Sequence, residues 1–270
     1  MKNCILIADY CIDPLTPQEL RSALLGHLSG KTNASISFVH SIPNTIHTTF
    51  LLKQILLTEE RLGDANNTVI FVNTDARIQT TQGVEKAKGA EFIVLRMKSG
   101  AFVCGPNAGY SFSLVRNDIE YAYHYKGLDK GTQFRSRELY MRVCALLMEG
   151  KEDEMDLDEI RNNDIPELEG FHVGHVDNYG NIKTTIPHSY MKGKHTFGDE
   201  ISVTIGNKTQ KAMYTHNMFG YKPDALVITP GSSGMPDDPY LEAVVWQHLP
   251  LKSGKLFFPN VVPGDNVIIR

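Results

Sequence analysis

The sequence predicts an α/β protein with a mostly parallel N-terminal sheet flanked by helices and a smaller C-terminal antiparallel β domain or barrel. Three observations support this prediction. Apolar strand-like runs alternate with helix-like segments in the first half, which is typical of an open parallel sheet. Short alternating segments separated by turn residues fill the second half, which is typical of antiparallel sheets and barrels. The acidic stretch 149–169 is poor in apolar residues, so we place the domains at residues 1–165 and 170–270.

The first half is expected to hold strands at 4–8, 35–39, 68–72, 91–97 and 101–104, with helices between or after them. The first helix is expected at 17–28, with Thr16 as its N-cap and Pro17 as its first residue. A second helix is expected at 48–62, and a strongly amphipathic one at 137–148 with Ser136 as its N-cap.

The second half is expected to be built from short strands with turn signals between them. The expected strands are 171–176, 181–186, 200–205, 209–213, 225–229, 241–247 and 266–270. The stretch 229–234 reads as a flexible loop after an apolar strand, whose N–H groups either cradle an anion or simply extend a hairpin connection.

Composition excludes several classes of function. The net charge is −4 and no basic stripe is present, so nucleic acid is not an expected partner. No apolar run approaches the roughly 20 residues of a membrane span, and the N-terminus lacks the features of a signal peptide. The four cysteines form no C-x-x-C pair, and Cys4 and Cys144 lie in apolar stretches, which favours a reducing, cytoplasmic setting.

Polar residues follow several of the expected strands, where ligands bind in open α/β sheets. Asp9 follows the first strand, and its carboxylate is suited either to a pair of sugar hydroxyls or to capping a turn. Asp75 and Arg77 follow the third strand and are either functional or a surface ion pair. Asn107 lies in the glycine-rich stretch 105–109, which is either a backbone-lined ligand loop or a turn.

The segment 177–181 is expected to be a tight connection between two strands, yet it carries more polar and aromatic groups than a turn needs. This surplus favours a binding loop. The run from His172 through His175 to Asp177 resembles a set of metal ligands, but on a strand His172 points away from the other two. The run therefore does not predict a metal site, and no cofactor is expected.

Six segments, spread over nearly the whole chain, match the motifs of one enzyme family in order. They are 7–9 (IAD), 39–43 (VHSIP), 103–109 (VCGPNAG), 134–138 (FRSRE), 177–181 (DNYGN) and 232–234 (SSG) with 240–243 (YLEA). On these segments the chain resembles the S-adenosyl-L-methionine hydroxide adenosyltransferases and the related fluorinases and chlorinases.

The resemblance implies a homotrimer with the ligand at a subunit interface, between the N-terminal domain of one chain and the C-terminal domain of its neighbour. It implies that Asp9 holds the ribose hydroxyls of S-adenosylmethionine or adenosine. The other implied binding residues line the nucleoside pocket (Phe134, Ser136), contact the methionine part and the adenine (Asp177, Tyr179, Asn181) or lie near the amino-acid end (Ser232, Ser233), and Asn107 belongs to the matching glycine-rich loop.

The chain departs from this family at the residues that surround the attacking water. The family's Asp, Arg and His fall on Asn73, Thr80 and Arg135. Asn73 has no carboxylate to act as a base, and Asp75 and Arg77 are candidates for a substitute pair. The candidate catalytic residues are therefore Asn73, Asp75, Arg77, Thr80 and Arg135.

Three functions remain open on this reading. The first is hydrolysis of S-adenosylmethionine to adenosine and methionine by attack of water at C5′. The second is binding of adenosine or S-adenosylmethionine without turnover. The third is an enzyme acting on another nucleoside-like substrate, with Asp75, Arg77 and Arg135 in new roles.

Overall fold

The computed structural model describes residues 1–74, 90–128, 134–246 and 252–270, with the side chain of Asn162 left out. The chain divides into two compact units, Met1–Leu168 and Glu169–Arg270. The first holds a mostly parallel sheet with helices, and the second holds a mostly antiparallel, barrel-like sheet. This confirms the expected fold class.

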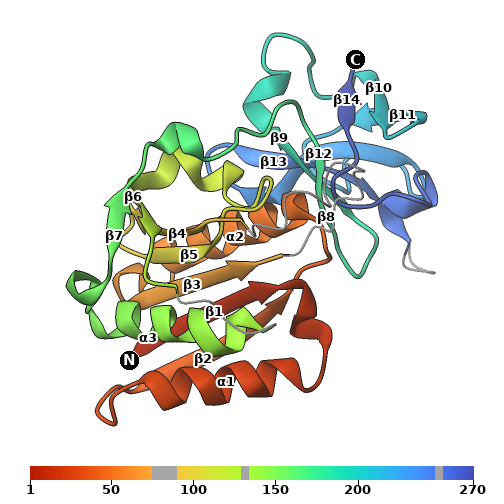
Figure 1. Ribbon diagram of the computed structural model, residues 1–270. Helices are drawn as coiled ribbons and strands as arrows, with labels where there is room; N and C mark the ends of the chain where they lie inside the picture. Colours follow the sequence, from red (N-terminus) through yellow and green to blue (C-terminus); the bar gives the residue numbers. More distant parts are fainter. Residues whose placement is uncertain (75–89, 129–133, 247–251) are drawn as a thin grey trace, which may run out of the picture. The chain divides into compact units, whose positions relative to one another are not determined.

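The sheet of the first unit has the strand order β2-β1-β3-β5-β4-β6-β7 (Figure 1). Its first four strands run parallel to one another, whereas β4, β6 and β7 join by antiparallel pairing. The strands are β1 (Lys2–Ala8), β2 (Ala34–His40), β3 (Thr68–Asn73), β4 (Phe92–Met97), β5 (Phe102–Pro106), β6 (Ile119–Tyr125) and β7 (Leu157–Glu159).

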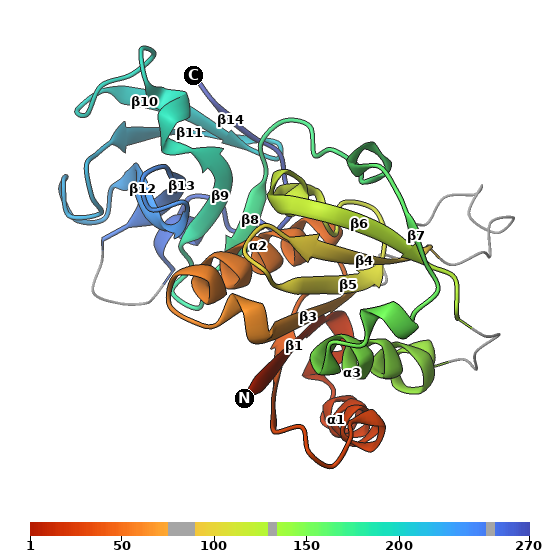
Figure 2. The ribbon, with the colours of Figure 1, turned by 90° about the vertical axis from the view of Figure 1, so that its left-hand side faces the viewer.

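Helices α1 (Thr16–His27) and α3 (Met141–Glu149) cover one face of this sheet, and α2 (Thr45–Arg61) covers the other (Figure 2). Strand β1 contributes buried side chains to the cores on both faces of the sheet, because successive residues of a strand point to opposite sides. Cys4 and Leu6 pack in the cluster under α1 and α3, whereas Ile5 and Ile7 pack in the cluster under α2.

The helix starts differ from those expected. Leu15 is the N-cap of α1 and Thr16 is already helical, because the carboxylate of Asp13 accepts hydrogen bonds from the N–H groups of Leu15 and Thr16. Thr16 is therefore not the N-cap. Helix α2 begins earlier than predicted, because the side chain of Asn44 accepts hydrogen bonds from the N–H groups of Ile46 and His47.

Two strands of the first unit were not predicted. Strand β6 carries only three buried side chains (Ile119, Ala122 and Tyr125) among more exposed polar and aromatic ones, so its apolar signal is weak. Strand β7 lies in the acidic stretch 149–169, which we placed at the domain boundary and where the sequence predicts no strand. It is the edge strand of the sheet, and its position at the edge explains why it tolerates so many charges.

The sheet of the second unit has the order β14-β10-β11-β12-β13-β9-β8. A bridge between His172 and Asn266, with backbone hydrogen bonds on either side of it, links the two ends of this sheet. The strands are β8 (Val173–Val176), β9 (Ile182–Pro187), β10 (Glu200–Ile205), β11 (Lys208–Tyr214), β12 (Leu226–Gly234), β13 (Pro239–Val245) and β14 (Val267–Ile269).

The expected loop at 229–234 is instead the second half of β12, so that prediction was wrong. The strand continues through Pro230 because the register shifts between Pro230 and Gly234, which is where a sheet tolerates proline and glycine.

Candidate functional site

The site candidates of the first unit come from the ends of its parallel strands. Strands β1, β2, β3 and β5 run in the same direction, so their carboxyl ends lie along one edge of the sheet. Asp9 follows β1, Asn73 ends β3, and Asn107 follows β5. The structure therefore brings these three predicted residues to the same edge.

A triangle of hydrogen bonds joins two of the predicted residues to Tyr10 at this edge. The Tyr10 hydroxyl donates to Ser136 Oγ over 2.8 Å, and Asn73 Nδ2 donates to Ser136 Oγ over 2.8 Å and to Tyr10 Oη over 3.2 Å. Both amide hydrogens of Asn73 are then used. Its carbonyl Oδ1 makes no hydrogen bond with the described residues, and Ser136 retains its own hydrogen to donate. The triangle thus offers one acceptor and one donor to a ligand.

Ser136 reaches this position because the chain enters α3 through a π-helical turn, Ser136–Tyr140. The predicted N-cap role of Ser136 was wrong, since its hydroxyl caps no backbone N–H and the side chain is buried. π-Helical turns are frequent at functional sites because they redirect side chains out of the regular helical spacing. Here the turn delivers the hydroxyl to Tyr10 and Asn73.

Phe134 extends the site with an aromatic face. Its ring meets the ring of Tyr10 edge-on, with 5.9 Å between centroids. The guanidinium of Arg137 lies 5.3 Å from the centroid of Phe134 and pairs with Glu19 and Glu138. Two rings at right angles beside a polar triangle form a corner suited to a flat heterocycle and its sugar.

Tyr10 is the residue of this site that the sequence did not predict. Burial raises its pKa, and the hydrogen bonds with Ser136 and Asn73 only partly oppose this effect. Tyr10 is therefore neutral at physiological pH and acts as a hydrogen-bonding group, not as a base. Its only signal in the sequence is its position directly after Asp9. Both residues belong to a short 3-10 helix, Asp9–Ile12, and Asp9 is half-buried.

A second set of hydroxyl groups lies at the same edge and was also missed. The side chains of Ser41, Thr48 and Thr74 are fully or almost fully buried and share hydrogen bonds of 2.6 to 3.2 Å. Ser41 follows β2, Thr74 follows β3 and Thr48 belongs to α2. Because these hydroxyls satisfy one another, they fix the ends of β2 and β3 beside the site.

The two other described candidates of this unit, Asn107 and Arg135, take no part in the hydrogen bonds of the triangle. Asn107 donates from Nδ2 to the carbonyl of Asp164, whereas its Oδ1 is buried without a partner among the described residues. Arg135 is exposed next to the π-helical turn. Asp75, Arg77 and Thr80 lie outside the described residues.

In the second unit, the loop between β8 and β9 is closed by its own polar groups. Asp177 Oδ1 accepts hydrogen bonds from the N–H groups of Tyr179 and Asn181, and Asp177 Oδ2 accepts one from Asn181 Nδ2. Asn181 Oδ1 in turn accepts the hydroxyl of Ser253. Asp177 and Asn181 therefore have structural roles, whereas Asn178 and the ring of Tyr179 are exposed to solvent.

Ser232 and Ser233 lie on β12 beside a buried ion pair. Lys183 Nζ donates to Glu242 Oε1 over 2.7 Å and to Ser232 Oγ over 2.8 Å, and the N–H of Ser232 also donates to Glu242. Ser233 Oγ is buried and has no partner among the described residues. His175 lies directly opposite Lys183 in the sheet, and burial, together with the charge of Lys183, lowers its pKa.

The described part of the chain contains no cluster of three His, Cys, Asp or Glu side chains arranged to hold a metal ion. None of its helices is long and apolar enough to cross a membrane.

No protein-family model and no curated protein matches this sequence. The fold, in contrast, is similar to solved structures. One is the crystal structure of an uncharacterized conserved protein from Thermotoga maritima, with a TM-score of 0.73, 18% identity and coverage of 99% of this chain and 100% of that one. Another is that of a conserved hypothetical protein from Thermus thermophilus, with a TM-score of 0.67, 14% identity and coverage of 100% of both chains. At these identities the similarity establishes a shared fold.

Proposed function

We propose that this protein binds S-adenosylmethionine at the carboxyl edge of its first sheet and hydrolyses it to adenosine and methionine. The observation that carries the proposal is the triangle of Tyr10, Asn73 and Ser136, with the ring of Phe134 beside it. The resemblance of the six sequence segments to the hydroxide adenosyltransferases supplies the ligand and the reaction.

The reaction makes modest demands on the protein. The oxygen of water forms a bond to C5′ as the bond between C5′ and sulfur breaks, and sulfur keeps the electron pair. Methionine leaves as a neutral thioether, so no general acid is needed, and the proton of the attacking water passes to solvent. The site must hold water, C5′ and sulfur in line and partly exclude bulk solvent.

In this proposal Asn73 Oδ1 accepts a hydrogen bond from the attacking water and Ser136 donates one to the ligand. Asp9, at the same edge, holds the ribose hydroxyls. The aromatic corner of Tyr10 and Phe134 packs against the nucleoside. Asn107, Asp177, Tyr179, Asn181, Ser232 and Ser233 remain predicted binding residues. The assembly in this proposal is a homotrimer, which light scattering tests as a mass three times the 30.2 kDa of one chain.

One feature of the triangle favours a second function, binding without turnover. None of Tyr10, Asn73 and Ser136 is a carboxylate or an imidazole, and Tyr10 keeps its proton. A triangle without a carboxylate or an imidazole is better suited to holding an adenosyl ligand than to activating water.

The test is incubation of the purified protein with S-adenosylmethionine in water enriched in ¹⁸O, followed by mass spectrometry. Attack at C5′ places ¹⁸O in the 5′-hydroxyl of adenosine and releases unlabelled methionine. We expect Asp9→Asn and Ser136→Ala to lower turnover at least tenfold, and Glu120→Gln, an exposed carboxylate changed in the same way, to leave it unchanged.

Calorimetry on the same proteins separates the two functions. Binding of S-adenosylmethionine without products, weakened by Asp9→Asn, supports the binding protein. The absence of both heat and products would overturn both functions.

A further inference from the structure

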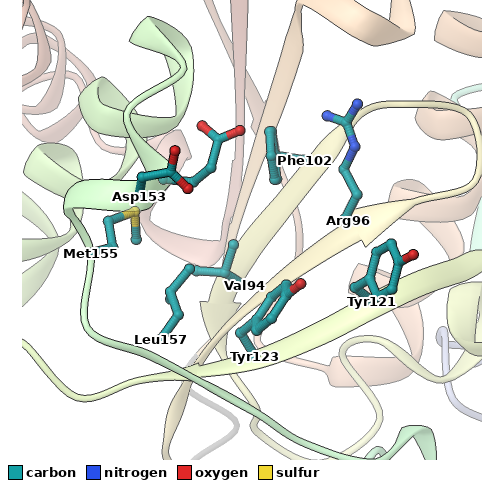
Figure 3. Close-up of a pocket in the computed structure, with 9 residues that line it drawn as sticks. Val94, Arg96, Phe102, Tyr121, Tyr123, Asp153, Met155 and Leu157 are labelled. Carbon is teal, nitrogen blue, oxygen red and sulfur yellow. The ribbon is translucent and has the colours of Figure 1, made fainter.

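A cavity of about 430 Å³ lies on the first sheet and is not explained by the proposed function (Figure 3). The residues that line it belong to β4, β5, β6 and β7 and to the 3-10 turn Glu152–Glu154, which follows α3. They include one cation, Arg96, and two acids, Glu152 and Asp153, among aromatic and apolar side chains.

This cavity is separate from the adenosyl site. Phe102 is the first residue of β5, whereas Asn107 follows its last residue, so the cavity lies toward the opposite end of that strand. Val94 and Phe102 pack with the core under α1 and α3, so the cavity lies on that face of the sheet and α2 lies on the other.

Two charged groups of the cavity lack partners within the described part of the chain. The Arg96 guanidinium stacks on the ring of Phe102, 4.6 Å from its centroid, and forms no ion pair with a described residue. Glu152 Oε2 is buried and has no hydrogen-bond partner in the described segments. A buried carboxylate oxygen without a donor is unfavourable. A ligand that brings a donor to Glu152 and an acceptor to Arg96 therefore satisfies both groups.

The cation and the acids lie apart, with apolar and aromatic surface between them. Figure 3 shows Arg96 and Asp153 on opposite sides of the cavity, with Val94 and Phe102 between them. Glu152 precedes Asp153 in the same short turn, so the two acids come from the same segment of the chain. A ligand that matches this lining is anionic at one end, cationic at the other and apolar in the middle.

We propose that this cavity binds a short zwitterion whose carboxylate and ammonium groups stand at opposite ends of an apolar body. The carboxylate pairs with the Arg96 guanidinium, whose planar fork suits a carboxylate. The ammonium group pairs with Glu152 and Asp153, and the body lies across Val94 and Phe102. The volume of the cavity is within the range of small-molecule sites.

Two kinds of molecule carry this chemistry. In an ω-amino acid, a methylene chain or a ring separates the ammonium group from the carboxylate. In a dipeptide, a peptide bond separates the two terminal charges, which stand roughly 7 Å apart when the chain is extended.

The lining disfavours three other classes of ligand. A free α-amino acid carries both charges on one carbon and cannot reach both sides of the cavity. A nucleotide or other polyanion would meet the carboxylates of Glu152 and Asp153, and a simple organic cation would meet the charge of Arg96. Only a ligand with separated opposite charges satisfies the two sides together.

The test compares isomers that differ in the position of the ammonium group. Norleucine is the α-isomer of 6-aminohexanoate, and phenylglycine is the α-isomer of 4-(aminomethyl)benzoate. Their binding to the full-length protein is measured by ligand-observed NMR titration, together with ω-amino acids of other chain lengths. We expect the tightest ω-amino acid to bind at least tenfold more tightly than its α-isomer.

The dipeptides Ala-Phe and Phe-Ala, titrated in the same way, distinguish the two sources. Dipeptides that bind more tightly than every ω-amino acid, and lose at least tenfold in affinity when the N-terminus is acetylated or the C-terminus amidated, identify a peptide site. The reverse order of affinity identifies an ω-amino acid site.

Variants assign the binding to this cavity. Arg96→Gln and Glu152→Gln are each expected to weaken binding at least tenfold. Arg61→Gln and Glu60→Gln make the same changes at exposed positions of α2, on the other face of the sheet, and are expected to leave binding unchanged. Asp9→Asn is also expected to leave it unchanged, so this proposal and the adenosyl site fail or succeed independently.

Combining ligand and protein changes assigns each end of the ligand. On the unchanged protein, the amine that lacks the carboxylate should bind at least tenfold more weakly than the zwitterion. On Arg96→Gln the two should bind about equally, because the partner of the carboxylate has been removed.

Three results would overturn the proposal: no binding of any ω-amino acid or dipeptide, equal affinity for the α-isomers, or binding unaffected by both Arg96→Gln and Glu152→Gln. If Arg96→Gln does not fold, the comparison of isomers on the unchanged protein and the Glu152→Gln variant still decide the question.

Discussion

Tyr10 contributes both a hydrogen-bonding hydroxyl and an aromatic ring to the candidate site. Its hydroxyl lies within hydrogen-bonding distance of both Asn73 and Ser136, and its ring packs edge-on against Phe134. Because burial raises its pKa, the phenol remains a neutral donor over the physiological range. A neutral network holds its geometry without attracting counter-ions, which is compatible with the cationic sulfonium ligand of the proposed function.

The raised pKa of Tyr10 predicts a specific dependence of stability on pH. An unfolded tyrosine loses its proton near pH 10, whereas folded Tyr10 keeps it to higher pH. Above about pH 10 the unfolded state therefore binds fewer protons, and stability falls as pH rises. The contribution of Tyr10 to this fall is at most about 1.4 kcal/mol per pH unit.

Urea denaturation of the unchanged protein and of Tyr10→Phe between pH 8 and 11 measures this contribution. We expect the free energy of unfolding of Tyr10→Phe to decline less steeply above pH 10. Parallel curves for the two proteins would show that Tyr10 ionises as easily in the folded state as in the unfolded one.

Individual site residues were predictable where local sequence decides their position, and not where tertiary contacts do. Asp9, Asn73 and Asn107 follow apolar strands, and the parallel order of those strands brings them to one edge. The resemblance assigned Ser136 to the site, but its predicted role as a helix N-cap was wrong. No sequence pattern indicates a π-helical turn. Tyr10 was missed because its partners are 63 and 126 positions away.

Among the elements, the β8–β9 loop shows how a binding motif also carries structure. Gly180 adopts φ +82°, and a Cβ at this position would lie 2.3 Å from the carbonyl oxygen of Lys252. Gly193 adopts a similar φ of +74° but has open space around it. Alanine substitutions at the two glycines therefore separate the loss of stability caused by backbone strain from the loss caused by close packing.

We expect Gly193→Ala to cost about 1–2 kcal/mol of stability, from the left-handed backbone alone. Gly180→Ala is expected to cost a further ~1–3 kcal/mol, because the loop must move away from Lys252. Urea denaturation of both variants gives the difference. Equal losses would mean that the loop relaxes freely and is not fixed against the Lys252 segment.

The cross-strand pair of Lys183 and Glu242 is a second element that the sequence did not reveal. The side chains are 15% and 8% exposed, and they face each other across β9 and β13. The strand positions were predicted, but pairing between residues 59 positions apart depends on the register of the whole sheet.

We expect Lys183→Met to cost about 3–5 kcal/mol, because it leaves the buried carboxylate of Glu242 without its cation. The double variant Lys183→Met with Glu242→Gln should recover at least half of this loss, since glutamine still accepts the N–H of Ser232. Lys211→Met is the matched control, because its pair with Glu200 is exposed, and it should leave stability almost unchanged. A small cost for Lys183→Met, measured by urea denaturation, would contradict this account.

For the whole molecule, fold class was predictable because it depends on periodicity and on the order of elements. Strand–helix alternation in the first half and short alternating strands in the second are properties that many residues share, so errors at single positions cancel. The details that failed were β6, which has few buried side chains, β7, which lies at the sheet edge, and the second half of β12, where the register is irregular.

Each unit has its own core, so the two are expected to unfold separately. The core of Glu169–Arg270 is assembled from buried residues of its own seven strands and the segments between them. Residues 169–270 expressed alone should therefore give a cooperative thermal transition by circular dichroism.

Leu241→Ala tests the origin of that transition, since Leu241 is fully buried in this core. It should lower the stability of the isolated unit by about 2–5 kcal/mol and that of the same transition in the full chain by a similar amount. Leu20→Ala, which opens a cavity in the core of Met1–Leu168, should leave that transition unchanged in the full chain. A single transition shifted equally by both variants would show that the units fold as one.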